Sequence, residues 1–159
     1  MATVSRPRLP SALVTPPTFD YDKHVAQGLM SGHEAAAGGL VGYLDIHHTA
    51  IGPGTLTAEI VVRDEMRTPF GNLHGGVLSA LCDHVLGTVC YPVIPKGHWA
   101  ATTEFKINLV APVVDGTCSA TAAIVSLTKR TAVVRIDVMN NDRLCAAAQG
   151  TVTIQAPRQ

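Results

Sequence analysis

The sequence predicts an α+β fold in which a six-stranded antiparallel sheet wraps around one long central helix. Three observations predict it. One apolar segment of the 159 residues has helical periodicity, and five other segments alternate apolar and polar side chains. Short polar loops join the last three of these segments. A period of two is typical of strands with one buried face, and that face is most simply buried against the apolar helix.

The composition is that of an ordinary globular chain without basic character. Hydrophobic residues make up 47% and charged residues 15%, which excludes a disordered chain, and with only 4% aromatic residues the core is expected to be aliphatic. Twelve Lys and Arg balance twelve Asp and Glu, so no nucleic-acid partner is expected. Asp83 and His84 interrupt the most apolar stretch, so we expect no membrane span and a cytoplasmic location.

Neither the cysteines nor the histidines predict a metal site. Cys82, Cys90, Cys118 and Cys145 are scattered without a C-x-x-C pair, so we expect small buried side chains in a reducing compartment. The adjacent residues 47–48 are both His, but they have no acidic partner at metal-ligand spacing and are expected at the surface. We therefore expect no metal site.

Residues 1–38 are expected to form an arm ahead of a single domain at residues 39–157. The start of the arm contains four prolines and no periodic pattern, and its apolar run is too short for a secretory signal. Residues 19–30 predict one short helix, with Asp20 or Asp22 near its start.

Two strands are expected ahead of the central helix. Residues 43–47 have the pattern of a short strand, and a Gly-Pro-Gly turn follows at residues 52–54. Residues 55–63 then alternate apolar and polar side chains.

Residues 75–90 predict the central helix, and two prolines end it. Its apolar side chains recur at helical spacing, and most of its other positions are small or apolar, so we expect protein around nearly all of it. Four strands follow at residues 102–110, 117–127, 131–139 and 143–155. A single curved sheet has free edges, so we expect two chains to pair edge to edge.

Two glycines stand where a loop enters the central helix. Gly75 and Gly76 let another molecule approach the backbone closely, because they carry no side chain. The first N–H groups of a helix have no partner inside it and lie at the positive end of its dipole. These groups are suited to a carbonyl oxygen that becomes an oxyanion, although a mere tight turn is the alternative.

Asp83 lies within the most apolar helix, where an unpaired carboxylate is costly. We expect it to be catalytic, with a structural buried acid as the alternative. It lies eight residue steps from Gly75, about 12 Å along one helix, so one carbonyl cannot touch both groups. If the two groups cooperate, antiparallel helices from two subunits must lie side by side.

The block at residues 69–83, with residues 102–108 and 111–112, resembles the hotdog-fold acyl-CoA thioesterases of the phenylacetate-pathway type. The likeness covers about residues 40–156 and rests on a His-Gly-Gly motif with an acid nine residues after the His. The resemblance implies the hotdog fold, an acyl- or aryl-acyl-CoA substrate, no cofactor, and a homodimer or a tetramer made of two dimers.

The resemblance also implies roles for three residues. The N–H of Gly75 polarises the thioester carbonyl, Asp83 of the second subunit activates water or attacks directly, and the hydroxyl of Thr102 helps to place the water. Many members carry Asn where this chain has Thr68, and Asn72 lies nearby in another register. Either residue is therefore a candidate for the carbonyl pocket.

Several other residues have two readings each. His74 is a general base or a residue that orients the loop, and Lys129 and Arg130 bind coenzyme A phosphates or belong to a solvated loop. Thr102 is a catalytic hydroxyl or an ordinary strand residue. The expected apolar walls of an acyl site are Leu78, Trp99 and Val110.

Two other functions stay open. One is a hotdog dehydratase or hydratase that acts on acyl thioesters, although the chain lacks the His and acid spacing that those enzymes tend to use. The other is a non-catalytic sensor that binds acyl-CoA. Release of free thiol separates the hydrolase from both.

Overall fold

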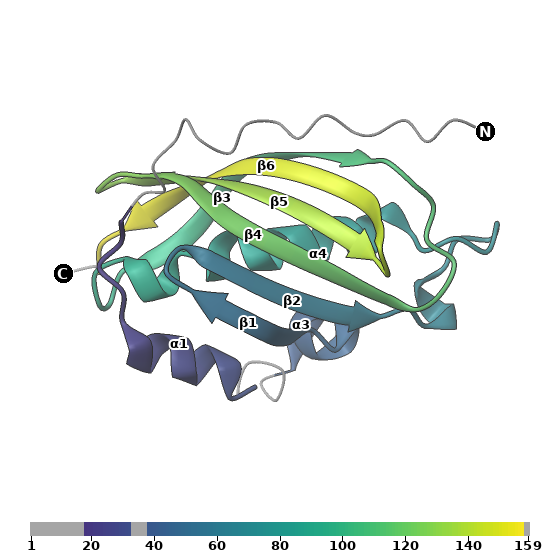
Figure 1. The fold of residues 1–159 in the computed structure, drawn as a ribbon, viewed down its shortest axis with the longest axis horizontal. Helices are drawn as coiled ribbons and strands as arrows, with labels where there is room; N and C mark the ends of the chain where they lie inside the picture. The colour runs from purple at the N-terminus through teal and green to yellow at the C-terminus, as the bar shows by residue number, and fades with distance from the viewer. Residues whose placement is uncertain (1–17, 33–37, 158–159) are drawn as a thin grey trace, which may run out of the picture.

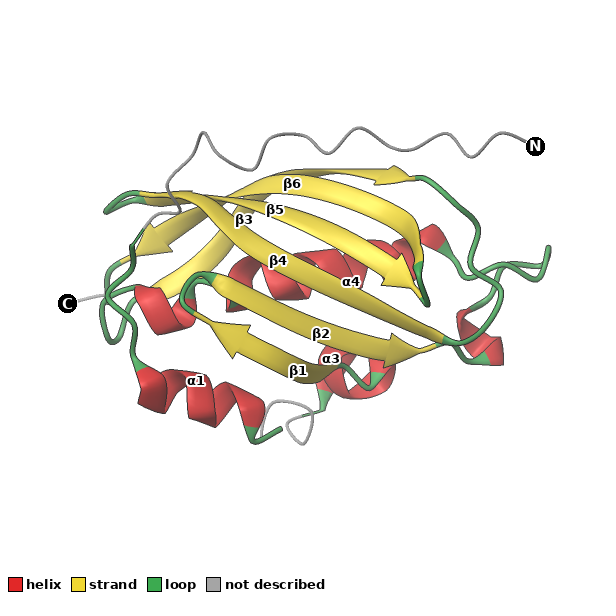
Figure 2. Cartoon of the chain, in the orientation of Figure 1, coloured by secondary structure: helices red, strands yellow, loops and turns green. Residues whose placement is uncertain are grey.

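A six-stranded antiparallel sheet curves around one long helix in the computed structural model, which describes residues 18–32 and 38–157 (Figures 1 and 2). The helices are α1 (Lys23–Met30), α3 (Gly39–Leu44) and α4 (Gly75–Thr88), with 3₁₀ turns η1 (Asp64–Met66) and η2 (Tyr91–Val93). The strands are β1 (His47–Gly52), β2 (Thr55–Val61), β3 (Trp99–Leu109), β4 (Thr117–Leu127), β5 (Thr131–Asn140) and β6 (Arg143–Gln155). The predicted fold class is therefore confirmed.

The strand order β1-β2-β4-β5-β6-β3 leaves β1 and β3 at the two edges of the sheet. The chain passes through α4 between β2 and β3, so β3 pairs with β6 at the far edge instead of with β2. The hairpins β4–β5 and β5–β6 form the predicted meander. Helix α1 packs beside β1, whereas β3 has an open edge.

Aliphatic side chains from one face of α4 and from the sheet form the core. Leu81, Val85 and Leu86 of α4 are fully buried there. Burying one such side chain stabilises the fold by about 1.5–3 kcal/mol, so this face keeps α4 on the sheet. All four cysteines are buried and free, as predicted.

One face of α4 is bare in the single chain. Gly76 and Asp83 are exposed, and Gly75 and Gly87 are only partly buried. The expectation that protein nearly surrounds this helix, and that Asp83 is a buried carboxylate, is therefore wrong for one chain. The reason is that the curved sheet covers only the side of α4 that carries the large aliphatic residues.

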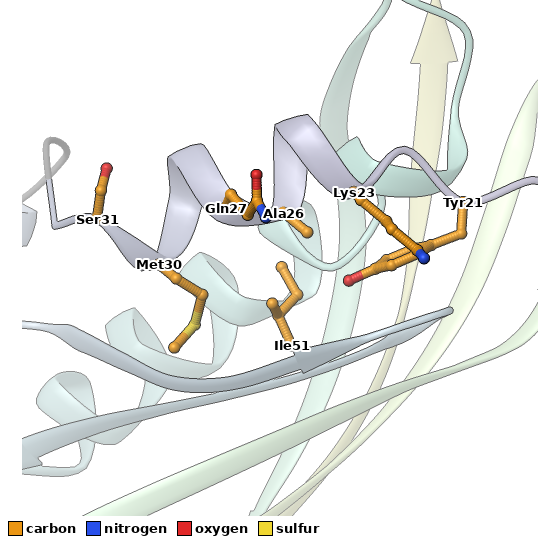
Figure 3. Close-up of a pocket in the computed structure, with 7 residues that line it drawn as sticks. All are labelled: Tyr21, Lys23, Ala26, Gln27, Met30, Ser31 and Ile51. Carbon is orange, nitrogen blue, oxygen red and sulfur yellow. The ribbon is translucent and has the colours of Figure 1, made fainter.

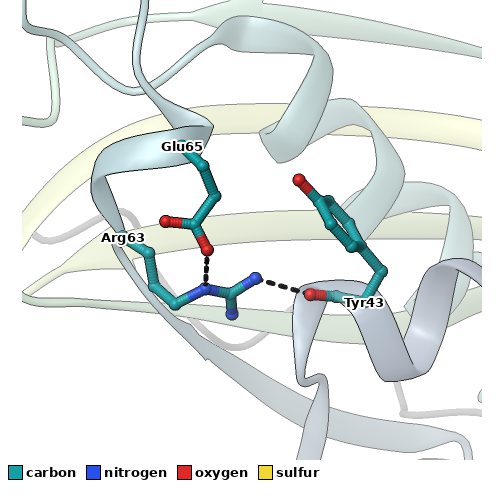
Figure 4. Close-up of polar contacts among 3 residues, drawn as sticks. All are labelled: Tyr43, Arg63 and Glu65. Atoms are coloured by element: carbon teal, nitrogen blue, oxygen red, sulfur yellow. Dashed lines mark hydrogen bonds and ion pairs between the residues drawn. The ribbon is translucent and has the colours of Figure 1, made fainter.

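The predicted strand at residues 43–47 is wrong. Its first two residues end helix α3, Asp45 caps that helix in the left-handed conformation at φ 54°, and β1 begins only at His47. Five residues are too few to separate a strand from a helical turn by periodicity. Arg63 fixes this corner, because its guanidinium donates to the Tyr43 carbonyl oxygen and to Glu65 (Figure 4).

The first residues of α1 and β3 also differ from the prediction. Helix α1 starts at Lys23 because the Asp22 carboxylate accepts the N–H groups of His24 and Val25, so Asp22 is its N-cap. Strand β3 starts at Trp99, three residues earlier than predicted.

The segment Gly75–Val93 is long and apolar enough to cross a membrane by length and composition alone. The sheet curves around this segment, and more than half of it is buried inside the fold (Figure 1). The segment therefore has the burial of the core helix of a globular domain.

Candidate active site

The first turn of α4 offers one free backbone N–H. His74 is the N-cap of α4, and its Nδ1 accepts the N–H of Gly76 at 2.9 Å. Among the described residues, the N–H of Gly75 has no hydrogen-bond partner. This N–H lies at the positive end of the helix dipole, where it can stabilise developing negative charge.

Backbone hydrogen bonds hold the loop in front of α4 in place. The N–H of His74 donates to the Met66 carbonyl oxygen at 2.9 Å, and the N–H of Leu73 donates to that of Val113 at 2.7 Å. In the neutral imidazole of His74, Nδ1 is an acceptor, so Nε2 carries the proton. No ring nitrogen is then left to act as a general base.

A cavity of about 340 Å³ opens beside this N–H. It brings together three residues singled out in the sequence, Thr68, Asn72 and Gly75. It also contains two of the three predicted wall residues, Leu78 and Val110. The other lining residues are all apolar: Phe70, Leu73, Leu109, Ala111, Pro112 and Val113.

Thr68 and Asn72 close the loop that borders the cavity. The N–H of Thr68 donates to the Asn72 carbonyl oxygen at 2.7 Å, and the N–H of Gly71 donates to that of Thr68 at 2.9 Å. The Thr68 hydroxyl accepts the N–H of Phe70 at 3.3 Å. Trp99, the third predicted wall residue, lies outside this cavity at the opposite end of β3.

Leu109 lies directly over Gly75. A Cβ atom added to Gly75 would stand 2.6 Å from Cδ1 of Leu109, closer than such atoms approach in proteins. The close approach of Leu109 therefore depends on the missing side chain at residue 75, since a Cβ there would push the exposed Leu109 side chain aside. This contact sets one side of the opening to the N–H.

Asp83 does not reach the cavity within one chain. It lies on the bare face of α4, and among the described residues its carboxylate has no hydrogen bond or ion pair. The eight residue steps from Gly75 to Asp83 correspond to about 12 Å along the helix axis. A single chain thus separates the free N–H from the carboxylate.

Thr102 lies at a β-bulge on the open edge of the sheet. It pairs with Val152, which is fully buried, so the Thr102 side chain lies on the face of the sheet that carries α4. The bulge falls between Thr102 and Glu104, and the Glu104 carboxylate accepts the Thr151 hydroxyl proton at 2.7 Å. Thr102 is exposed because β3 is an edge strand with no strand beside it on its outer side.

Lys129 and Arg130 lie in the hairpin between β4 and β5, far along the sheet from the cavity. Both residues are exposed, and the Arg130 carbonyl oxygen accepts the N–H of Ile154 at 2.8 Å. Lys129 lines a pocket of about 250 Å³ together with His98. One chain therefore does not bring these cations to the N-terminus of α4.

A second apolar groove lies between α1 and β1, and nothing in the sequence predicted it (Figure 3). It has a volume of about 490 Å³, and Ala26 and Met30 of α1 face Ile51 of β1 across it. Lys23 and Tyr21 close one end. The groove shares no residue with the cavity at Gly75.

A pair of histidines flanks the bare face of α4. Nε2 of His48 in β1 lies 2.8 Å from Nε2 of His84, the residue after Asp83. The expectation that residues 47–48 are surface histidines is therefore wrong for His48, which is partly buried against α4. No sequence pattern predicts this contact, because the partners are 36 residues apart and belong to different elements.

Comparisons with known proteins find thioesterases and a CoA-thioester hydrolase among the similar proteins. A family model described as "Thioesterase superfamily" matches residues 70–147, which include the His-Gly-Gly motif and Asp83. The chain is 29% identical over 118 residues to the 1,4-dihydroxy-2-naphthoyl-CoA hydrolase of Escherichia coli, an alignment that covers 74% of this chain and 87% of that protein.

Solved structures share the fold. A mutant of a thioesterase enzyme from Staphylococcus aureus aligns with a TM-score of 0.71 at 27% identity, covering 73% of this chain and 98% of that one. The PaaI protein from the phenylacetic acid degradation operon of E. coli aligns with a TM-score of 0.75 at 21% identity, covering 84% and 96%. The chain is thus a hotdog-fold thioester hydrolase whose residues 70–147 match the thioesterase superfamily.

Proposed function

We propose that this chain hydrolyses an acyl- or aryl-acyl-coenzyme A thioester to the free acid and coenzyme A. One observation carries the proposal: the N–H of Gly75, without a partner among the described residues, opens into an apolar cavity of about 340 Å³. An acyl or aryl group fits such walls, and the thioester carbonyl then accepts the free N–H. The relative that acts on a naphthoyl-CoA supports an aromatic acyl group.

The working unit in this proposal is a homodimer. The edge of β3 is open, and the bare face of α4 carries Gly76 and Asp83. If two chains pair along β3 with their α4 helices antiparallel, the partner subunit's Asp83 comes to the N–H of Gly75. This arrangement covers both features at once, and two such dimers can form a tetramer.

In the proposed reaction, the carbonyl oxygen of the thioester accepts the hydrogen bond of the Gly75 N–H. Asp83 takes a proton from water, the water oxygen bonds to the carbonyl carbon, and the oxyanion forms at the N–H. The C–S bond then breaks, and the thiolate takes the proton from Asp83. The Thr102 hydroxyl, on the α4 side of the sheet edge, places the water. Attack by Asp83 itself is the variant of this step, and it passes through an anhydride.

The other residues support the carbonyl site. His74 orients the N–H groups by accepting that of Gly76, and this leaves the N–H of Gly75 for substrate. Thr68 and Asn72 border the cavity and supply polar groups next to the carbonyl. Antiparallel pairing along β3 also brings the second subunit's Lys129 and Arg130 toward the end of the sheet where the cavity opens, so they can bind coenzyme A phosphates.

The experiment that tests this function is thiol release by the Asp83→Asn and Asp83→Ala variants, followed with a thiol-reactive dye. We expect both variants to remain folded dimers and to lose most activity. Native rates in Asp83→Ala would contradict the assignment. Hydration of an enoyl thioester without free thiol would indicate the hydratase, and tight acyl-CoA binding without turnover would indicate the sensor.

A further inference from the structure

We propose that His84 and His48 are positioning residues that fix the rotation of helix α4, and with it the direction in which Asp83 leaves the helix. The proposal rests on the proposed role of Asp83. Neither histidine touches the cavity at Gly75, so both act through the carboxylate and not on the substrate.

The two imidazole rings form a well-directed hydrogen bond. Their Nε2 atoms are 2.8 Å apart, their centroids are 5.1 Å apart, and their planes differ by 17°. The centroid separation exceeds the nitrogen separation by about two ring radii, so the rings lie edge to edge with the nitrogens nearly in line. Such a bond depends strongly on the angle between its partners.

A backbone carbonyl fixes the direction of this hydrogen bond. Nδ1 of His48 lies 2.9 Å from the carbonyl oxygen of Leu29, which can only accept, so His48 carries its proton on Nδ1. Nε2 of neutral His48 is then an acceptor, and His84 must donate to it from Nε2. The chain of bonds links the last turn of α1, strand β1 and helix α4.

This hydrogen bond attaches the side of helix α4 to strand β1, and we call it the tether. Among the described residues, the pair with His48 is the only side-chain hydrogen bond that joins α4 to another helix or strand, since the bonds of His74 and Ser79 return to α4 itself. The remaining attachment is apolar packing, which is not directional. A directed bond at His84 therefore sets the rotation of the helix at the next residue, Asp83.

His84 is uncharged at neutral pH. Burial lowers the pKa of His84 to about 4, the nearby His48 acts in the same direction, and Asp83 opposes it weakly. A neutral imidazole next to Asp83 leaves the carboxylate without an ion pair, so its charge stays available for the water. The pair thus orients Asp83 without neutralising it.

The test compares variants that keep a planar ring but lose the hydrogen bond with a variant that keeps the hydrogen bond without the ring. His84→Phe and His48→Phe remove the bond, and we expect kcat for thiol release to fall about tenfold to a hundredfold while KM stays within about twofold. The double variant should lose no more than either single one, because both remove the same bond. His84→Gln, whose amide N–H can donate to His48, should recover most of kcat.

His47→Phe is the matched control. His47 is the neighbouring residue on β1, it is exposed, and it pairs with Asp45, so its loss should leave kcat unchanged. Equal kcat in wild type and His84→Phe overturns the proposal, and so do additive losses or a failure of His84→Gln to recover. If His84→Phe does not fold, His48→Phe and His84→Gln decide the matter alone. The Asp83→Asn variant is assayed in the same experiment to separate the two proposals. Full activity of Asp83→Asn would contradict the proposed hydrolysis mechanism, and not only the positioning role of the histidines.

Discussion

Nδ1 of His74 accepts the N–H of Gly76 at 2.9 Å, and this one bond divides the first turn of α4 into a satisfied N–H and a free one. An N-cap normally serves helix stability. Here it also removes the competing donor next to Gly75, so a carbonyl oxygen that enters the cavity meets one directed N–H.

The first prediction follows from this cap. His74→Ala should destabilise the fold by about 0.5–2 kcal/mol, because the N–H of Gly76 loses its acceptor. His74→Asn, which can cap as well, should keep most of that stability. Urea denaturation of the three proteins measures the difference. Equal stability of His74→Ala and wild type would show that the cap is not needed.

Much of the fold could be predicted from the sequence, because apolar and polar residues alternate over long segments. Strands β4 and β6 span the predicted residues 117–127 and 143–155. Within β6, however, simple alternation would place Leu144 on the buried face with Ala146, yet Leu144 is 38% exposed, whereas Cys145 is buried. The pairing of β5 with β6 is irregular between Val138 and Met139, and this bulge changes which β6 residues face the core. Alternation in the sequence alone does not reveal a bulge.

The site could be predicted only in part. The free N–H at Gly75 follows from where a helix begins, and that position is encoded locally. The contact of His84 with His48 and that of Gly75 with Leu109 join residues that lie far apart along the chain, so periodicity could not reveal them. The exposure of Asp83 depends on how far the sheet curves around α4, which is a property of the whole fold.

The second prediction concerns the space over Gly75. Gly75→Ala should strongly reduce thiol release, because the new methyl group displaces Leu109 and narrows the opening to the N–H. Leu109→Ala in the same chain should restore part of the activity by making room. Gly28→Ala is the control, since an added Cβ there meets nothing within 4 Å. That control should instead stabilise α1 by up to about 1 kcal/mol.

The third prediction concerns the hairpin cations. Replacing Lys129 and Arg130 by Ala should raise KM for an acyl-CoA while leaving kcat unchanged, because these exposed side chains lie away from the reacting bond. The same change should leave KM unaltered for the matching S-acyl pantetheine, which lacks the nucleotide phosphates. Equal KM shifts on both thioesters would assign the effect to something other than phosphate binding.

The fourth prediction is a pH dependence of stability. Burial lowers the pKa of His84 to about 4 from an ordinary value of 6.5, so the folded chain resists a proton that the unfolded chain accepts. Stability from this group is full above pH 6.5 and is lost as the pH falls from 6.5 to 4. The loss is on the order of 3 kcal/mol, since each pKa unit corresponds to about 1.4 kcal/mol.

Urea denaturation between pH 7 and pH 4 measures that loss. His84→Gln carries no titrating group at this position, so its free energy of unfolding should fall less steeply than that of wild type over the same range. The carboxylates that titrate below pH 5 are common to both proteins and cancel in the comparison. Parallel curves for the two proteins would mean that His84 takes its proton as readily in the fold as in the unfolded chain, and that its hydrogen bond to His48 survives protonation.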